Sequence, residues 1–247
     1  MLNVTTTREV ISTGIREISE ELGGGLRPGS MVFIEGESES GKSVMAQHLA
    51  YGALTDSDEN AVAYYTTENS VKSLIGQTDS MSLSMMDYFL TDRLRIYPLT
   101  MRNCYGETQK YLLHILSHHL SRLPERYNLV ILDSLTLFLT HVKLLAILDF
   151  FQGCRDMCKQ GRSIVLLANT HAFKKETITR AHDLSDDYIR LRSEDMLVGS
   201  DQVDKRIIRV MEVTKLRGAE RPNRDSIRFE IKPRTGIHII PFVKVRV

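Results

Sequence analysis

The sequence predicts a three-layer α/β fold in which a doubly wound, mostly parallel sheet continues into an antiparallel C-terminal extension. Two runs, 127–134 and 163–168, are almost continuously apolar, which is typical of strands covered on both faces in a parallel sheet. Stretches with helical periodicity alternate with these runs, as the crossovers of a doubly wound sheet require. After residue 205, three short β-like runs follow one another through short turns, which indicates antiparallel strands.

The bulk composition favours one domain over residues 1–247, because no repeat, low-complexity tract or linker divides the chain. A net charge of +1 gives no general attraction to nucleic acid or to an anionic membrane. Three cysteines argue against a disulfide framework, and the N-terminus has no signal pattern. The longest apolar stretch, 135–151, is interrupted by His141, Lys143 and Asp149, which is too polar for a membrane span. We therefore expect a cytoplasmic protein without a transmembrane segment.

The elements follow from periodicity and from the residues that end each pattern. In the first half we expect a short helix from about residue 15 to the glycines at 23–25, strands at 31–34, 61–66 and 94–99, and helices at 42–54, from Asn69 or Ser70 through Ile75, and at 107–120. In the second half we expect strands at 127–134, 163–168, 207–214, 226–231 and 236–240, and a helix at 144–158. The stretch 170–202 is polar and charged with little periodicity, so we expect a long exposed loop there.

Residues 36–43 read GESESGKS and match the phosphate-binding P-loop, G-x-x-x-x-G-K-[ST]. An apolar strand precedes the loop and a helix follows it, as the motif demands. Backbone N–H groups and the helix N-terminus would face the phosphates, Lys42 would contact the β and γ phosphates, and Ser43 would ligate Mg²⁺. The predicted phosphate-binding residues are Gly36, Glu37, Ser38, Glu39, Ser40, Gly41, Lys42, Ser43 and Val44.

Polar residues end three further predicted strands, and strand ends at this edge of a doubly wound sheet bind ligands. Asp133 has the position of the acid that holds Mg²⁺ beside a P-loop. Glu68 can act as general base toward the attacking water, or can serve only the dipole of the next helix. The residues Asn169, Thr170 and His171 can sense the γ phosphate, or can form an ordinary polar strand exit.

Lys215 and Arg217 flank one residue at the end of a β-like run, so both side chains can project to the same side. Residues 205–247 hold 12 basic and 4 acidic side chains, whereas 183–204 hold seven acidic and two basic ones. Such segregation suits head-to-tail contact between identical subunits. Lys215 and Arg217 would then reach a neighbour's phosphate like an arginine finger, the alternative being a solvated basic face.

These motifs, in this order, resemble the RecA/KaiC-like ATPases over nearly the whole chain. The matching features are ISTGI at 11–15, LGGGL at 22–26, PGS at 28–30, the P-loop, TE at 67–68, Asp133 and KLRG at 215–218. Within that family the short chain, TTE at 66–68 and the run at 236–241 resemble the accessory ATPases of the archaellum, the archaeal flagellum.

The resemblance implies a RecA-like fold that binds ATP and Mg²⁺ and assembles into a ring, expected to be a hexamer. It also implies two partners, the archaellum motor ATPase FlaI and a membrane-associated scaffold protein of the motor. The protein would then lie peripherally at the cytoplasmic face of the membrane. Motility is the process that this resemblance indicates.

Two departures from the family pattern bear on the rate of hydrolysis. KaiC-like relatives commonly carry two adjacent acids where this chain has Thr67 and Glu68, which leaves one candidate base. Glu37 and Glu39 inside the P-loop would repel a triphosphate unless they point outward. Both features favour slow or absent turnover, so whether the protein is an enzyme stays open.

Two other functions remain as alternatives. A RecA-class recombination or repair ATPase would need DNA-binding loops, but those after Asp133 and Asn169 lack a basic, aromatic-rich pattern, which disfavours nucleic acid. A KaiC-like signalling ATPase would phosphorylate one of its own serines or threonines. A search for an acid-stable phosphoprotein distinguishes that alternative from a nucleotide-dependent ring.

Overall fold

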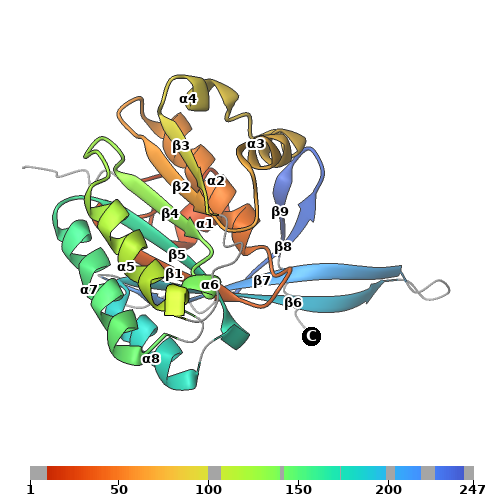
Figure 1. The fold of residues 1–247 in the computed structure, drawn as a ribbon. Coiled ribbons are helices and arrows are strands. Elements are labelled where there is room, and N and C mark those ends of the chain that lie inside the picture. Colours follow the sequence, from red (N-terminus) through yellow and green to blue (C-terminus); the bar gives the residue numbers. More distant parts are fainter. Residues whose placement is uncertain are drawn as a thin grey trace, which may run out of the picture.

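In the computed structural model, the strands of the described residues form one nine-stranded sheet (Figure 1). The structure describes residues 10–99, 107–139, 142–172, 174–198, 204–217 and 226–241. The strand order is β3-β2-β4-β5-β1-β6-β7-β8-β9. Their bounds are β1 (Met31–Gly36), β2 (Val62–Thr66), β3 (Leu94–Pro98), β4 (Leu129–Asp133), β5 (Ser163–Asn169), β6 (Asp187–Val198), β7 (Asp204–Leu216), β8 (Ile227–Lys232) and β9 (Gly236–Ile240).

Parallel pairing runs from β3 through β6, and the strands from β6 to β9 pair antiparallel. The predicted fold class, a mostly parallel sheet with an antiparallel C-terminal extension, is confirmed. The central strand β1 lies between β5 and β6, with Met31 opposite Ile164 and Val32 opposite Asp187. Both neighbours of this strand therefore come from the second half of the chain.

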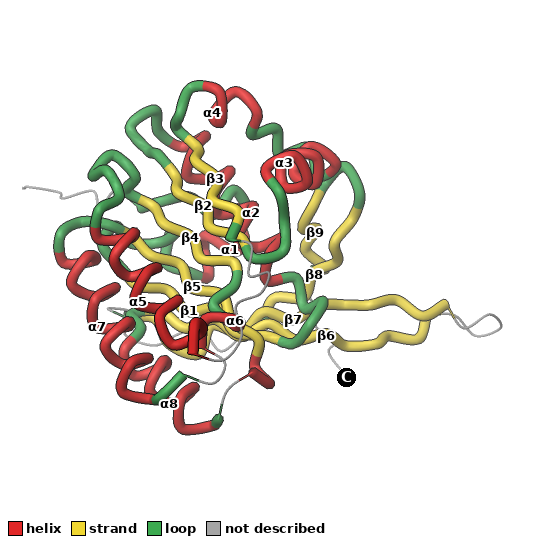
Figure 2. The backbone as a smooth tube through the Cα atoms, in the orientation of Figure 1, coloured by secondary structure: helices red, strands yellow, loops and turns green. Residues whose placement is uncertain are grey.

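Helices cover both faces of the parallel strands, which makes three layers (Figure 2). One face carries α1 (Arg16–Glu21), α2 (Lys42–Asp56), α3 (Val71–Ser80) and α4 (Met86–Leu90), and the other carries α5 (Glu107–Ser121), α6 (Thr136–Leu139), α7 (Leu144–Lys159) and α8 (Lys175–Leu184). Val32 and Ile34 face the first core, whereas Met31 and Phe33 face the second. This double burial explains why residues 31–34 of β1 are apolar without interruption.

The prediction of a long exposed loop at 170–202 is wrong, because this stretch contains a short 3₁₀ turn (Thr170–Ala172), helix α8 and strand β6. Charged side chains at the start of β6 have partners in the fold, so this part of the strand lacks an apolar pattern. Asp187 pairs with Arg27 at 2.8 Å, and Arg190 pairs with the buried Glu35 at 2.5 Å. Beyond β1, the ribbon of β6 and β7 projects away from the body of the molecule (Figure 1).

The remaining predicted elements are present, most within one to three residues of their expected ends. The helix expected to run through Ile75 extends to Ser80, and its cap is Ser70, whose side chain accepts a hydrogen bond from the backbone N–H of Ser73 at 3.1 Å. The short helices α4 and α6 were not expected from periodicity. None of the helices in the described ranges combines the length and the apolar character needed to cross a membrane.

A buried histidine on α2, His48, forms a hydrogen bond to the C-terminal hairpin of β8 and β9. Nε2 of His48 accepts a hydrogen bond from the backbone N–H of Ile237 at 3.0 Å. The backbone of Gly236 passes so close that a β-carbon there would lie 2.3 Å from the same ring nitrogen. Burial lowers the pKa of His48 to about 4, so its ring is neutral at pH 7.

Candidate functional site

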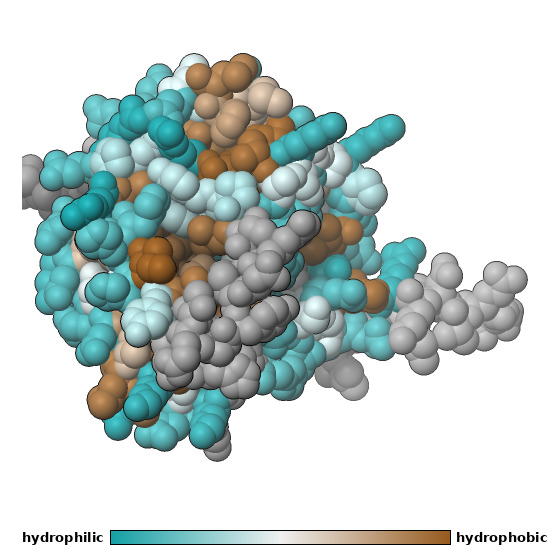
Figure 3. Space-filling view, viewed as in Figure 1, coloured by the Kyte–Doolittle hydropathy of each residue, from teal (hydrophilic) through white to brown (hydrophobic). Residues whose placement is uncertain are grey.

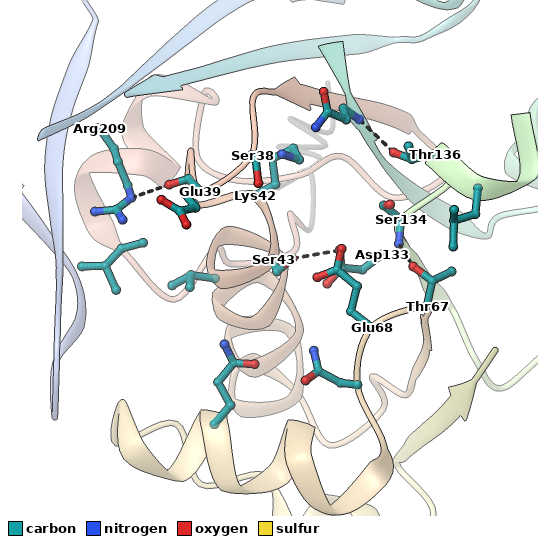
Figure 4. A pocket seen from close by; sticks show the side chains of 17 residues that line it. Ser38, Glu39, Lys42, Ser43, Thr67, Glu68, Asp133, Ser134, Thr136 and Arg209 are labelled. Carbon is teal, nitrogen blue, oxygen red and sulfur yellow. Dashed lines mark hydrogen bonds between the residues drawn. The ribbon is translucent and has the colours of Figure 1, made fainter. Parts of the chain in front are cut away.

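A cavity of about 740 Å³ opens at the carboxyl edge of the parallel strands (Figure 4). Four strand ends contribute to it, as predicted: the P-loop after β1, Glu68 after β2, Asp133 at the end of β4 and Asn169 at the end of β5. Of the nine predicted P-loop residues, six line the cavity: Ser38, Glu39, Gly41, Lys42, Ser43 and Val44. The predicted grouping of these strand ends is therefore present in the fold.

The P-loop turns tightly between β1 and α2. Ser40 is buried and donates a hydrogen bond to the carbonyl of Glu37 at 2.8 Å, which closes the turn. Gly41 has φ of 93°, a left-handed conformation that favours glycine, and α2 begins at the next residue. Glu37 and Glu39 are exposed, so their side chains are not buried in the turn. Gly36, Glu37 and Ser40 lie outside the cavity wall.

Lys42 is the first residue of α2, and its side chain reaches back to the start of the loop. Its Nζ donates hydrogen bonds to the carbonyl oxygens of Gly36 at 3.0 Å and Glu37 at 2.5 Å. Burial lowers the pKa of Lys42, and the nearby carboxylates of Asp133, Glu68 and Glu37 oppose that shift. Its ammonium group is thus held by weak neutral acceptors, which an anionic ligand can replace.

Ser43 and Asp133 place two oxygen atoms side by side below the loop. The Ser43 hydroxyl donates to Oδ1 of Asp133 at 3.0 Å, and the Tyr64 hydroxyl donates to Oδ2 at 2.7 Å. Burial raises the pKa of Asp133, while the hydrogen bonds from Tyr64 and Ser43 lower it. The peptide bond that follows Asp133 is cis.

These two oxygen ligands fit Mg²⁺, which is commonly held by one or two protein oxygens together with phosphates and water. Within the described ranges, no group of three or more His, Cys, Asp or Glu side chains is arranged to hold a metal ion. A cation here would therefore need further ligands from outside the protein, such as phosphate oxygens and water. Mg²⁺ bound with a nucleotide meets that requirement better than a protein-held structural metal.

The other strand ends differ in how they meet the cavity. Figure 4 shows the Glu68 side chain directed toward Ser43 and Asp133. Asn169 lines the wall, and its backbone N–H donates to Oγ1 of Thr136 at 3.0 Å. Thr170 and His171 lie outside the wall, where Nε2 of His171 is 3.5 Å from the exposed Glu37 carboxylate.

Lys215 and Arg217 lie at the opposite edge of the parallel sheet from the cavity. The residue between them pairs with Asp187, which in turn pairs with Val32 at the start of β1. Lys215 Nζ donates to the carbonyl of His182 at 2.8 Å, and Arg217 donates to Asp186 at 2.5 Å. Neither side chain contacts the P-loop of its own chain.

Several residues that line or support the site were not predicted. Arg209 on β7 and Ile231 on β8 reach the cavity from the antiparallel strands, and Tyr64 supports Asp133 from within β2. Arg209 belongs to the basic stretch that we assigned to subunit contact, and no spacing signal separates it from its neighbours. The alternation of β2 does place Tyr64 on one face, but not against a particular carboxylate.

A P-loop at the carboxyl edge of a parallel sheet, with a serine and an aspartate beside it, defines the class of P-loop nucleotide-binding proteins. Residues 11–244 match the family model described as "ATPase: KaiC". The chain belongs to this KaiC family of ATPases.

Two relatives and one solved structure are similar to this chain over nearly its whole length. The archaeal flagellar ATP-binding protein FlaH of Sulfolobus acidocaldarius is 24% identical over 234 residues, which are 94% of this chain and 97% of the relative. FlaH of Methanocaldococcus jannaschii is 24% identical over 230 residues, covering 90% and 91% of the two chains. The crystal structure of the flagellar accessory protein FlaH from M. jannaschii matches with a TM-score of 0.77 at 22% identity, over 95% of this chain and all of that one.

Proposed function

We propose that this chain is an ATP-binding protein of the archaellum motor, acting as a single domain over residues 1–247. Binding of ATP and Mg²⁺ favours a ring, expected to be a hexamer, which regulates or scaffolds the motor ATPase. The observation that supports this proposal most is that the side-chain oxygens of Ser43 and Asp133 lie 3.0 Å apart in the same cavity as Lys42. The names of the relatives, archaeal flagellar ATP-binding proteins, support the assignment to the archaellum.

The residues of the site divide the binding of ATP and Mg²⁺ among them. Backbone N–H groups at residues 36–43 would hold the phosphates, and Lys42 would exchange its two carbonyl acceptors for phosphate oxygens. Ser43 and Asp133 would hold Mg²⁺, which neutralises phosphate charge when it is bound. Because Asp133 is buried and its pKa is raised, its ionised form gains from the cation.

Hydrolysis, where it occurs, would depend on Glu68 as general base. The carboxylate of Glu68 would accept the proton of a water molecule that attacks the terminal phosphate. At the end of β5, Asn169 together with Thr170 and His171 would sense that phosphate by hydrogen bonding. Since Glu68 is the one acid at this strand end, we expect slow turnover.

Assembly into a ring would bring Lys215 and Arg217 of one subunit to the phosphates of the next. Their place at the sheet edge opposite the cavity supports action on a neighbour rather than on their own chain. Arg217 is exposed and bound to Asp186, so it would exchange one carboxylate for a phosphate on assembly. Head-to-tail contact closes into a ring where the rotation between subunits is a whole fraction of a turn, which this proposal requires.

The proposed partners are the motor ATPase FlaI and a membrane-associated scaffold protein, at the cytoplasmic face of the membrane. An exposed apolar surface over α4 supports the proposal of a protein partner. Figure 3 shows apolar side chains gathered over α4, where Leu90 is 72% exposed and Met86 is 42% exposed. Exposed apolar patches commonly mark such contacts.

The mass of the protein in solution, with and without ATP and Mg²⁺, tests binding, assembly and their coupling. Wild type should shift to a ring with nucleotide, and Lys42→Ala should lose both nucleotide binding and the shift. Lys72→Ala, an exposed lysine on α3, is the matched control and should behave as wild type. The same samples should bind FlaI only in the assembled form. Equal binding of Lys42→Ala to FlaI with and without ATP, as tight as wild type, would refute the proposal.

A further inference from the structure

Arg209 connects the antiparallel part of the sheet to the P-loop. It projects from β7, and its Nε donates a hydrogen bond to the carbonyl oxygen of Glu39 at 3.1 Å (Figure 4). The packing is close, since a β-carbon on Gly41 would lie 3.1 Å from Cδ of Arg209 and 3.3 Å from Cδ1 of Ile231. The arginine is thus part of the wall against which the loop folds.

Glu39 has an unusual backbone for a residue other than glycine. Its φ is 63°, in the left-handed region that costs free energy when a β-carbon is present. A strained residue persists only where its surroundings hold it. The hydrogen bond from Arg209 fixes the carbonyl of this residue and so helps to hold the loop in this conformation.

The two acids of the P-loop have different surroundings. Glu37 faces the ring of His171 at 3.5 Å, outside the cavity wall. Glu39 lines the cavity, and Figure 4 shows its carboxylate on the same side of the loop as Arg209, remote from Ser43 and Asp133. Burial lowers the pKa of Arg209 and the attraction of Glu39 opposes this, but a guanidinium stays charged in either case.

We propose that Arg209 is a positioning residue that makes an acidic P-loop compatible with a triphosphate. It binds the backbone of Glu39 and attracts its carboxylate, and so keeps that negative charge turned away from the phosphates. The inference rests on the proposed ATP site and adds the reason why that site tolerates an acid in its wall. Arg209 acts through Glu39, and direct contact between Arg209 and the nucleotide is the competing explanation.

A double-mutant cycle separates these explanations, with ATP and Mg²⁺ as the titrated ligand in calorimetry. Arg209→Gln should weaken ATP binding about tenfold, equivalent to about 1.4 kcal/mol, because the Glu39 carboxylate then repels the phosphates. Glu39→Gln alone should bind ATP more tightly than wild type, because it removes a negative charge from the cavity wall and keeps the backbone of residue 39. The double variant Arg209→Gln with Glu39→Gln should recover the affinity of Glu39→Gln.

Matched controls use the neighbouring charges. Glu37→Gln in place of Glu39→Gln should not rescue Arg209→Gln, and Arg206→Gln, an exposed arginine on the same strand, should bind normally. Thermal unfolding confirms that each variant is folded.

An unchanged affinity of Arg209→Gln would overturn the inference, and so would a double variant as weak as Arg209→Gln. Absence of ATP binding by wild type would instead refute the proposed function itself.

Discussion

Tyr64 donates a hydrogen bond of 2.7 Å to Oδ2 of Asp133, while Ser43 donates to Oδ1 of the same carboxylate at 3.0 Å. Tyr64 is fully buried on β2, in register with Ile131 on the neighbouring strand β4. Both carboxylate oxygens therefore have a fixed donor, so the Asp133 side chain cannot rotate freely. A ligand for Mg²⁺ is oriented in this way before the cation binds.

Replacing Tyr64 with phenylalanine should move the acid limit of nucleotide binding upward in pH. Asp133 must be ionised to hold Mg²⁺, and its pKa is already raised by burial. Removing the Tyr64 hydrogen bond removes an interaction that lowers this pKa, so Mg²⁺-dependent ATP binding should fail at a higher pH than in wild type. Calorimetric titrations between pH 5 and pH 8 measure the shift. Tyr65→Phe is the control, since its hydroxyl contacts His119; equal pH profiles for Tyr64→Phe and wild type would contradict the prediction.

Glu68→Gln should separate nucleotide binding from hydrolysis. The amide keeps the shape of the side chain but cannot accept the proton of the attacking water, so turnover should fall about a hundredfold or more. ATP affinity should stay equal or increase, because a negative charge near the phosphates has been removed. Phosphate release and calorimetry on the same samples provide the two readouts, with the exposed Glu59→Gln as control. Wild-type turnover in Glu68→Gln would exclude this residue as the base.

A mixing experiment tests whether Arg217 acts on a neighbour. Lys42→Ala lacks a working ATP site but retains Arg217, and Arg217→Ala has the opposite defect, so neither should assemble alone. An equimolar mixture can form one complete interface per pair, and should give ATP-dependent dimers by mass measurement. Arg217→Ala mixed with the doubly substituted chain should give none. If the first mixture also stays monomeric while wild type assembles, Arg217 does not complete the neighbour's site.

The pH dependence of stability should carry a contribution from His48. The pKa of His48 falls from 6.5 to about 4 on folding because the ring is buried. The unfolded chain therefore binds this proton at a higher pH, so the free energy of unfolding should decrease as pH falls from about 6.5 to about 4, by at most about 3 kcal/mol.

Urea unfolding at a series of pH values tests this contribution. His48→Gln keeps an acceptor for the N–H of Ile237 and should lose the acid-dependent part of the decrease. His118→Gln, on an exposed face of α5, should keep it. Identical pH slopes for wild type and His48→Gln would show that the ring does not carry the effect.

The sequence allowed the parallel sheet and the strand-end residues to be predicted because both depend on local patterns. Residues 31–34 of β1 are apolar since they are buried on both faces, and the P-loop is a fixed spacing of glycine, lysine and serine. Strand β6 was not predicted, because its residues are fixed by distant partners and not by a local pattern. Its residues Asp187 and Arg190 pair with Arg27 and Glu35, more than a hundred residues away, and periodicity carries no information on such pairs.

The same limit applies within the site. Asp133 ends an apolar strand and was identifiable, whereas Arg209 lies in the middle of a charged strand that reaches the P-loop only after the sheet has formed. A triphosphate requires Glu37 and Glu39 to point away from it; Glu37 lies outside the cavity wall, whereas Glu39 lines the cavity beside Arg209. Which arginine faces which acid depends on the register of β7, and that register is a tertiary property.

The place of β1 between β5 and β6 has a consequence for synthesis of the protein on the ribosome. Both strands that flank the P-loop strand emerge long after it, since residue 31 pairs with residue 164 and residue 32 with residue 187. Because synthesis proceeds at about 5–20 residues per second, β1 stays without its neighbouring strands for on the order of ten seconds. During that interval an apolar strand is exposed, and chaperones have access to it. A chain released before β6 would therefore lack the nucleotide site although it contains the whole P-loop motif.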